Sequence, residues 1–326
     1  MTEDELIEKL RAIVAPAAPS ALLVGIGDDA AVWQPSRSHR SVITTDALVE
    51  GVHFTRAAMS AADAGHRALA SNLSDIAAMG AKPVLATIAF GTGAADEAWI
   101  LECYRGIAAL AVRTGCAIAG GDIVRAPAIT IAITIVGEVR PSNLKTRAGM
   151  HPGDTIAVTG PLGASRAGLA VSAEPQPAGD PDALAALAAF RTPEPRLAEG
   201  RWLAASRNVR AMMDTSDGLS TDLARLARAS GTGATIETIP VAAAAQAIAQ
   251  RSGANPEQWA LDGGEDFELL VAVATRAFSH LAGRFHARFG RPLLRVGVAT
   301  AEGGVRFADG RAVTSAGWDH LRAEAP

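Results

Sequence analysis

Two adjacent aspartates, Asp28 and Asp29, strongly constrain the fold of the first part of the chain. They follow the apolar residues 21–24 and two glycines, Gly25 and Gly27. Neighbouring carboxylates repel each other, and each loses hydration when it is buried. Such a pair is stable beside a cation or where water reaches both groups, and it predicts a loop of that kind.

The same pattern of an acid beside glycine, serine or threonine recurs along the chain. Later segments of this kind contain Asp46, Asp75, Asp122, Asp214 with Asp217, and Glu265 with Asp266. A single aspartate of this type usually belongs to a turn or a helix cap. For the whole set, we predict that the segments converge around one cleft that holds metal ions and handles phosphate.

Magnesium suits such a set of acids. Mg²⁺ prefers carboxylate and water oxygens and is commonly held by one or two carboxylates together with substrate phosphates. Phosphoryl transfer brings many negative charges together, and metal ions stabilise that charge in the transition state. The three lysines, Lys9, Lys82 and Lys145, are not part of a P-loop motif, so metal ions are the expected counter-charge.

A dinucleotide-binding loop is the main alternative for residues 25–30. This segment fits the pattern GxGxxA, and Asp46 follows at about the distance of a ribose-binding acid. However, Asp28 and Asp29 would repel a pyrophosphate at the start of a helix. Trp33 and Pro35 also follow too soon for a crossover helix to form.

The composition is that of a folded protein with room for two domains. The chain has 326 residues, 49% of them apolar, and a net charge of -4, which argues weakly against nucleic-acid binding. Its strongest apolar run, residues 129–136, is too short for a membrane span. Cys103 and Cys116 match neither a zinc nor a redox motif, and we expect a cytoplasmic protein.

The apolar periodicity predicts an α+β fold. Helical spacing covers residues 61–79 and 96–114, and a β-branched run at 129–139 predicts a strand. Strands and helices do not alternate regularly, which disfavours a doubly wound parallel sheet. The character of the sequence changes near Pro141, so we expect an N-terminal domain over 1–140 and a C-terminal α+β domain over 141–326.

Eight motifs in order resemble the thiamine-monophosphate kinase family, which belongs to the aminoimidazole ribonucleotide synthetase-like superfamily. Taken singly, only residues 46–54 and 72–81 are specific. The eight motifs are 25–30, 44–54, 72–81, 120–122, 146–149, 214–219, 263–269 and 317–320. The resemblance implies ATP-dependent phosphorylation of thiamine monophosphate to thiamine diphosphate. It implies direct in-line transfer with several Mg²⁺ ions and no phosphoenzyme.

The resemblance also implies an assembly and a set of site residues. The N-terminal sheet would pair with that of a second subunit to form a barrel in a homodimer, and the C-terminal domain would close over the nucleotide. The implied metal ligands are Asp29, Thr44, Thr45, Asp46, Asp75, Asp122, Asp214 and Asp217, with Asp28 as a further ligand or a residue that orients its neighbour. Asp46, Asp75 and Asp122 are expected to be catalytic.

Two further groups of residues are implied as ligand contacts. Arg147 and Ser216 resemble ATP contacts, and Tyr104 or Arg105 is a further candidate near the nucleotide. His53, Glu265 and Trp318 resemble contacts to thiamine monophosphate. The chemistry agrees, because an indole can stack on a cationic thiazolium and a carboxylate can offset its charge.

The chain departs from the family pattern at two positions, and related functions stay open. Ile123 stands where a threonine is expected, and Phe267 where a tyrosine is frequent.

A selenophosphate synthetase would need a reactive cysteine near the start, but the first cysteine is Cys103. Aminoimidazole ribonucleotide synthetase is harder to reject by chemistry, although His53 and residues 317–320 argue against it. A non-catalytic sensor on the same fold would bind ATP without turnover.

Overall fold

The structure is a computed structural model that describes residues 3–17, 21–27, 30–93, 97–172, 179–314 and 317. Its chain divides into two compact units. The first unit comprises Met1–Ile76, Gly80–Leu144 and Arg191–Leu197, and the second comprises Ala77–Met79, Lys145–Phe190 and Ala198–Pro326. The chain therefore passes between the units several times.

A four-stranded sheet forms the centre of the first unit. Its order is β3 (Arg40–Val49), β6 (Thr130–Val139), β4 (Lys82–Gly91) and β5 (Ala117–Val124). Only β4 and β5 are parallel, and α3 (Glu97–Thr114) connects them; the other pairs are antiparallel. The sheet is mixed, as the irregular order of predicted strands and helices indicated.

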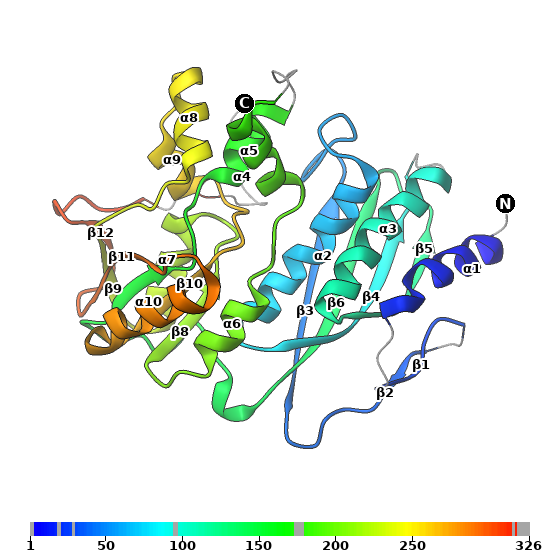
Figure 1. The fold of residues 1–326 in the computed structure, drawn as a ribbon, viewed down its shortest axis with the longest axis horizontal. Helices are drawn as coiled ribbons and strands as arrows, with labels where there is room; N and C mark the ends of the chain where they lie inside the picture. The colour runs from blue at the N-terminus through cyan, green and yellow to red at the C-terminus, as the bar shows by residue number, and fades with distance from the viewer. Residues whose placement is uncertain are drawn as a thin grey trace. The chain divides into compact units, whose positions relative to one another are not determined.

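Two helices cover one face of this sheet. Figure 1 shows α2 (Ala61–Ala78) and α3 side by side across it. Leu69 and Leu73 of α2 are fully buried, as are Ile133 and Ile135 of β6. The predicted helix over 61–79 is therefore confirmed to within one residue, because its apolar stripe packs on the sheet.

The opposite face of the sheet is only partly covered. A short hairpin of β1 (Leu22–Val24) and β2 (Val32–Trp33) packs Leu22 and Trp33 against one end of this face. Elsewhere Ile43 is 69% exposed and Val124 is 48% exposed. This open face thus presents apolar side chains to solvent.

The first helix, α1 (Glu3–Val14), packs on α3 and is followed by the short η1 (Ala15–Ala17).

A segment from the second half of the chain belongs to the first unit. Residues 191–197 lie against α2, α3 and the loop before α2. The Arg191 Nε atom donates a hydrogen bond of 2.7 Å to the Ala58 carbonyl, and His66 Nε2 lies 3.0 Å from the Pro193 carbonyl. Arg113 forms an ion pair with Glu194.

The second unit contains a six-stranded sheet. Its order is β12 (Gly304–Phe307), β9 (Gly233–Ile236), β11 (Leu294–Thr300), β7 (Thr155–Val158), β10 (Leu269–Val273) and β8 (Val209–Asp214). Only β12 and β9 are parallel. Leu269 pairs with Asp214, so the end of β8 lies beside the start of β10.

The helices that follow η2 (Pro141–Asn143) in the chain lie mostly in the second unit. They are α4 (Ala164–Ser172), α5 (Pro181–Arg191), α6 (Leu197–Ala204), α7 (Leu219–Ala229), α8 (Ala243–Ser252), α9 (Pro256–Asp262) and α10 (Thr275–Phe289). Leu219, Leu223 and Leu226 of α7 are fully buried in the core of the unit. Among the described residues, no helix combines the length and apolar character that a membrane span requires.

Candidate active site

In the first unit, a hydrogen bond connects two of the expected metal ligands. Thr44 on β3 donates from Oγ1 to Asp75 Oδ2 on α2, at 2.5 Å. Asp46 lies two residues further along β3, so its side chain points to the same face of the strand as Thr44. Asp46 is exposed, and its Oδ1 accepts a hydrogen bond of 2.9 Å from the Ala47 nitrogen.

The sheet register places Asp122 on the other face. Asp46 is opposite Ile133, which is opposite the buried Ile88, whereas Asp122 is opposite the exposed Ala89. Paired residues share a face, and neighbouring rows alternate between the two faces. The register therefore puts Thr44 and Asp46 on the helix-covered side, where Thr44 meets Asp75 of α2. It leaves Asp122 on the open side, near the end of β5.

Thr45 also points away from Thr44. Its hydroxyl donates to the Ile133 carbonyl at 3.1 Å and accepts from the Thr134 hydroxyl at 3.0 Å. Within the part of the chain that the structure describes, no three His, Cys, Asp or Glu side chains lie close enough together to hold a metal ion. The oxygens of Thr44, Asp46 and Asp75 nevertheless have the hard-donor chemistry that Mg²⁺ prefers. Asp28 and Asp29 lie outside the described residues.

The expected ligand contacts of the first unit differ in exposure. His53 accepts a hydrogen bond of 3.1 Å at Nδ1 from the Val49 nitrogen, which fixes its ring on the loop after β3. Tyr104 is only 5% exposed and packs on Phe90, with the ring centroids 5.8 Å apart. Arg105 is exposed and forms an ion pair of 2.6 Å with Glu102. Of these two candidates, Arg105 is the one that solvent reaches.

In the second unit, the motif after β8 and the motif before β10 are joined through their backbones. The Glu265 nitrogen donates to the Ser216 carbonyl at 2.8 Å, and the Phe267 nitrogen donates to the Thr215 carbonyl at 3.0 Å. Thr215 and Glu268 bond reciprocally: the Thr215 nitrogen donates to the Glu268 carbonyl, and the Glu268 nitrogen donates to Thr215 Oγ1. These contacts bring Ser216 and Glu265, two expected ligand contacts, together.

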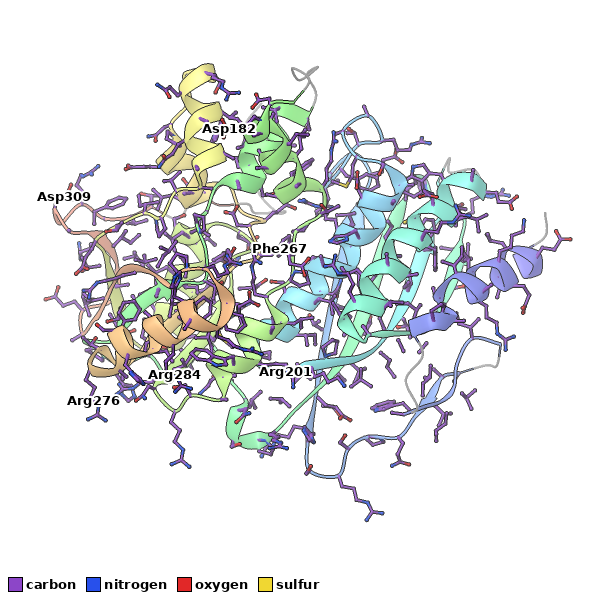
Figure 2. All side chains as sticks on the ribbon, in the orientation of Figure 1. Asp182, Arg201, Phe267, Arg276, Arg284 and Asp309 are labelled. Carbon is purple, nitrogen blue, oxygen red and sulfur yellow. The ribbon has the colours of Figure 1, made fainter. Side chains whose placement is uncertain are left out.

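Left-handed backbone conformations shape the loop before β10. Glu265 has φ of 56° and Phe267 has φ of 51°, although neither is glycine. L-residues with a side chain rarely adopt this conformation, which costs about 1–2 kcal/mol per residue. Phe267, labelled in Figure 2, is buried and marks the end of this loop. Strain of this kind is often found at functional sites.

A buried carboxylate supports the loop that carries Asp217. Asp222, on the first turn of α7, is fully buried and accepts a hydrogen bond of 3.0 Å from the Asp217 nitrogen. Arg225 forms ion pairs with both Asp217 and Asp222. Burial and the nearby Asp217 carboxylate raise the pKa of Asp222 to about 7. Asp214, at the end of β8, is 3% exposed.

The backbone N–H groups at the end of the glycine-containing segment 160–163 bind a carboxylate of the same chain. Asp266 accepts hydrogen bonds from the Gly163 nitrogen at 2.7 Å and the Ser165 nitrogen at 3.2 Å, at the start of α4. Glu268 is also buried, and it binds the Thr159 hydroxyl at 2.6 Å and Arg291 at 2.5 Å. Three segments of the second unit therefore meet at residues 265–268.

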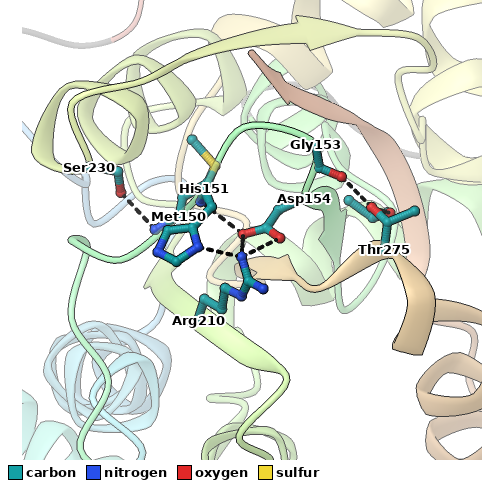
Figure 3. A network of polar contacts seen from close by, with 8 residues as sticks. Met150, His151, Gly153, Asp154, Arg210, Ser230 and Thr275 are labelled. Atoms are coloured by element: carbon teal, nitrogen blue, oxygen red, sulfur yellow. Dashed lines mark hydrogen bonds and ion pairs between the residues drawn. The ribbon is translucent and has the colours of Figure 1, made fainter. Parts of the chain in front are cut away.

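The backbone around Arg147 is held by polar contacts. Ser230 donates from Oγ to the Arg147 carbonyl at 2.9 Å. Ser230 also accepts from the Met150 nitrogen at 3.1 Å (Figure 3). Asp154 accepts from the His151 nitrogen at 2.8 Å and forms an ion pair with Arg210 at 3.1 Å. The Arg147 side chain is exposed, so a fixed backbone carries a guanidinium that a ligand can reach.

Comparison with known proteins identifies the family. Residues 27–139 match the family model of the AIR synthase related protein, N-terminal domain, and residues 151–309 match that of the C-terminal domain. The thiamine-monophosphate kinase of Escherichia coli (strain K12) is 36% identical over 313 residues, covering 91% of this chain and 92% of the relative. That of Rhodopirellula baltica is 38% identical over 293 residues, covering 86% and 85%. The chain belongs to the thiamine-monophosphate kinase family.

Solved structures agree with this family. The thiamine-monophosphate kinase from Stenotrophomonas maltophilia K279a has a TM-score of 0.85 and 33% identity, covering 96% of this chain and 98% of that one. AaThiL complexed with AMPPCP and TMP has a TM-score of 0.78 and 29% identity, covering 98% and 97%. The hydrogenase maturation protein HypE, at 17% identity and a TM-score of 0.74, shares the fold.

Membership of the thiamine-monophosphate kinase family was predicted from the eight motifs and is confirmed. Trp318 and its neighbours at 318–320 lie outside the described residues. Asp222 was not predicted as a site residue, although an acid on the first turn of a helix directly after the 214–218 motif was a usable signal. Asp266 was predicted only as one of the acids around a metal-binding cleft, and Glu268, within the 263–269 motif, was given no role of its own.

Proposed function

We propose that the chain is a kinase that transfers the γ-phosphoryl group of ATP to thiamine monophosphate, forming thiamine diphosphate and ADP. The observation that carries this proposal is the near end-to-end match to AaThiL, whose solved complex holds AMPPCP and TMP. The more than 30% identity to thiamine-monophosphate kinases over most of both chains supports the same activity.

Several Mg²⁺ ions would complete the site. When bound, they neutralise the charge that gathers on the phosphates during transfer. In the first unit, Asp75 and Asp46 would hold metal from one face of β3 and α2, and the Thr44 hydroxyl fixes the orientation of Asp75. The other proposed ligands are Asp28, Asp29, Thr45, Asp122, Asp214 and Asp217. Among these, Asp122 and Thr45 lie on the open side of the sheet, opposite to Thr44 and Asp46.

Nucleotide and substrate would bind through separate groups. Arg147 and Ser216 are proposed to contact ATP, with Arg105 a better candidate than the buried Tyr104. His53, Glu265 and Trp318 are proposed to contact thiamine monophosphate. A carboxylate at Glu265 would lower the energy of the positively charged thiazolium ring, and its loop is already ordered by bonds to Ser216 and Thr215.

A homodimer is part of the proposal. The open face of the first sheet exposes Ile43 and Val124, and a second copy could cover it to close a barrel. We further propose residues 1–140 as the metal-binding and dimerisation domain and 141–326 as the domain that closes over the nucleotide. A cytoplasmic location is proposed as well; the free, buried thiols of Cys103 and Cys116 suit a reducing compartment.

A direct assay tests the proposed reaction. Purified protein is mixed with ATP, Mg²⁺ and thiamine monophosphate, and the products are separated by chromatography. Thiamine diphosphate and ADP should appear in equal amounts, and AMPPCP in place of ATP should give no diphosphate. Formation of aminoimidazole ribonucleotide from its own precursor, with no thiamine diphosphate, would overturn the assignment. Binding of ATP with no turnover of thiamine monophosphate would point to a sensor instead.

A further inference from the structure

The start of α4 forms an anion-binding nest that is occupied by a side chain of the same unit. The backbone N–H groups of Gly163 and Ser165 donate to the two carboxylate oxygens of Asp266, at 2.7 Å and 3.2 Å, and the Ala164 N–H also bonds to this carboxylate. The first N–H groups of a helix have no partner within the helix, and the helix dipole favours a negative charge there.

The filled nest has a chemical consequence. A glycine-containing segment that leads into a helix is a common phosphate-binding arrangement. Here Asp266 uses the same N–H groups that a phosphate would need, so this helix start cannot serve as a phosphate site while the carboxylate is in place. The nest therefore binds the Asp266 carboxylate rather than a phosphate of the nucleotide.

Asp266 lies between the two strained residues of its loop. Glu265 and Phe267, on either side, both have a left-handed backbone. Such conformations persist only where surrounding contacts hold them. Two backbone hydrogen bonds to Ser216 and Thr215 hold one side of the loop, and the Asp266 side chain holds the other side by its bonds to the start of α4.

We propose that Asp266 is a positioning residue: by filling the nest at the start of α4, it holds the backbone of Glu265 in the conformation that presents the Glu265 carboxylate to thiamine monophosphate. The inference rests on the proposed function, because it takes Glu265 as a substrate contact. Asp266 itself does not touch the substrate in this proposal.

The first test separates the two substrates kinetically. In Asp266→Ala the loop loses one of its two attachments, so the KM for thiamine monophosphate should rise about tenfold or more, which corresponds to about 1.4 kcal/mol of binding. The KM for ATP should stay within about twofold of its value in the unchanged protein. An unchanged KM for thiamine monophosphate would overturn the proposal, and so would an equal rise in both KM values.

Asp180 provides a matched control. Its carboxylate also accepts hydrogen bonds at a helix start, from the Asp182 nitrogen at 3.0 Å and the Ala183 nitrogen at 3.3 Å of α5, and it pairs with Arg251. It is remote in sequence from the three motif segments, and its neighbour Asp182 is labelled in Figure 2. Asp180→Ala removes a helix cap of similar energy, about 1 kcal/mol, but should leave the KM for thiamine monophosphate unchanged.

A second measurement needs no enzymatic activity. The amide protons of Glu265 and Phe267 are protected by their bonds to Ser216 and Thr215. Hydrogen exchange followed by mass spectrometry should show faster exchange over 263–268 in Asp266→Ala than in Asp180→Ala. Equal exchange in both variants would overturn the proposal. If Asp266→Ala does not fold, Asp266→Asn keeps one acceptor oxygen and should show the same changes to a smaller degree.

The two assignments can fail separately. If the unchanged protein does not phosphorylate thiamine monophosphate, the proposed function fails, and the hydrogen-exchange result still decides whether Asp266 holds the loop. If the kinase is active but Asp266→Ala matches it in both measurements, only the positioning role of Asp266 is wrong.

Discussion

The carboxylate of Asp222 lies 3.0 Å from the backbone nitrogen of Asp217, and Arg225 forms ion pairs with both residues. Asp222 is fully buried, whereas the Asp217 side chain is 24% exposed. The buried Asp222 carboxylate thus supports the turn, whereas the Asp217 carboxylate is partly exposed. The loop that carries a proposed metal ligand is therefore held by the helix that follows it.

Replacing Asp222 should damage both stability and activity. Asp222→Ala leaves the Asp217 N–H without its buried acceptor, which costs about 1–3 kcal/mol in denaturant unfolding. Kinase activity should fall about tenfold or more, because a displaced Asp217 no longer supports phosphoryl transfer. Asp309→Ala, which removes an exposed pair with Arg311, is the control and should change stability by less than about 1 kcal/mol. Full activity in Asp222→Ala would contradict a supporting role.

The acids on the helix-covered face of the first sheet should matter more for activity than for folding. Asp46→Ala or Asp75→Ala should lower kcat about 100-fold or more, as expected when a group that stabilises transition-state charge is lost. Thermal unfolding should shift little for the exposed Asp46. Asp63→Ala, near the start of α2, is the control, and Asp122→Ala tests the acid on the open face. Retained activity in the first two variants would refute the metal assignment.

Alanine substitution of two glycines with almost the same φ should distinguish the cost of backbone strain from the cost of a steric clash. Gly264 has φ of 65° and Gly253 has φ of 70°. An added Cβ at Gly264 would lie 2.6 Å from the Ser216 carbonyl oxygen, whereas nothing lies within 4 Å at Gly253. Gly253→Ala should cost about 1 kcal/mol of unfolding free energy with normal kinetics. Gly264→Ala should cost clearly more and reduce activity; equal effects in the two variants would count against the close packing of the two motif loops.

The pH dependence of stability should reveal Asp266. Burial, and to a smaller extent the nearby Glu268 carboxylate, raise the pKa of Asp266 from its ordinary value of 3.8 to about 7. Between about pH 4 and about pH 7 the folded protein thus keeps a proton that the unfolded chain has released, so the stability contributed by Asp266 falls as the pH rises. The difference in unfolding free energy between the unchanged protein and Asp266→Ala should therefore shrink from about pH 5 to about pH 8. A constant difference would show that the pKa of Asp266 is ordinary.

The open face of the first sheet should govern the oligomeric state. Ile43→Lys places a charge where a second copy is proposed to pack, and sedimentation should show a shift from dimer to monomer. Val112→Lys, at a 51% exposed position on α3, adds the same charge to the other side of the unit and should leave the dimer intact. A dimer that survives Ile43→Lys would place the interface elsewhere.

Local patterns in the sequence predicted much of the fold. The helix predicted over 96–114 is found at Glu97–Thr114, because Ile100, Ile107 and Leu110 recur at helical spacing and form a buried stripe. The short helix α9 was not predicted. Its start depends on the cap by Asn255, and only Ala260 and Leu261 are buried, so its apolar pattern is too short to recognise.

Contacts between distant segments could not be predicted in the same way. The acidic motifs identified the family, but the pairing of β3, β6, β4 and β5 decides which face each acid occupies. Asp46 and Asp122 look alike in sequence and lie on opposite faces. The hydrogen bonds from the start of α4 to Asp266 join residues about a hundred positions apart. The sequence around either residue does not indicate such a contact.

The return of residues 191–197 to the first unit limits how this chain can be divided. A fragment that starts at Lys145 would carry this segment without Ala58, His66 and Arg113, the residues that bind it. A fragment that ends at Leu144 would leave those residues uncovered. Neither half is therefore an independently folding domain. Expression of one half alone, or exchange of halves between relatives, should yield insoluble or protease-sensitive protein. Transfer of residues 191–197 together with the residues that bind them should prevent this.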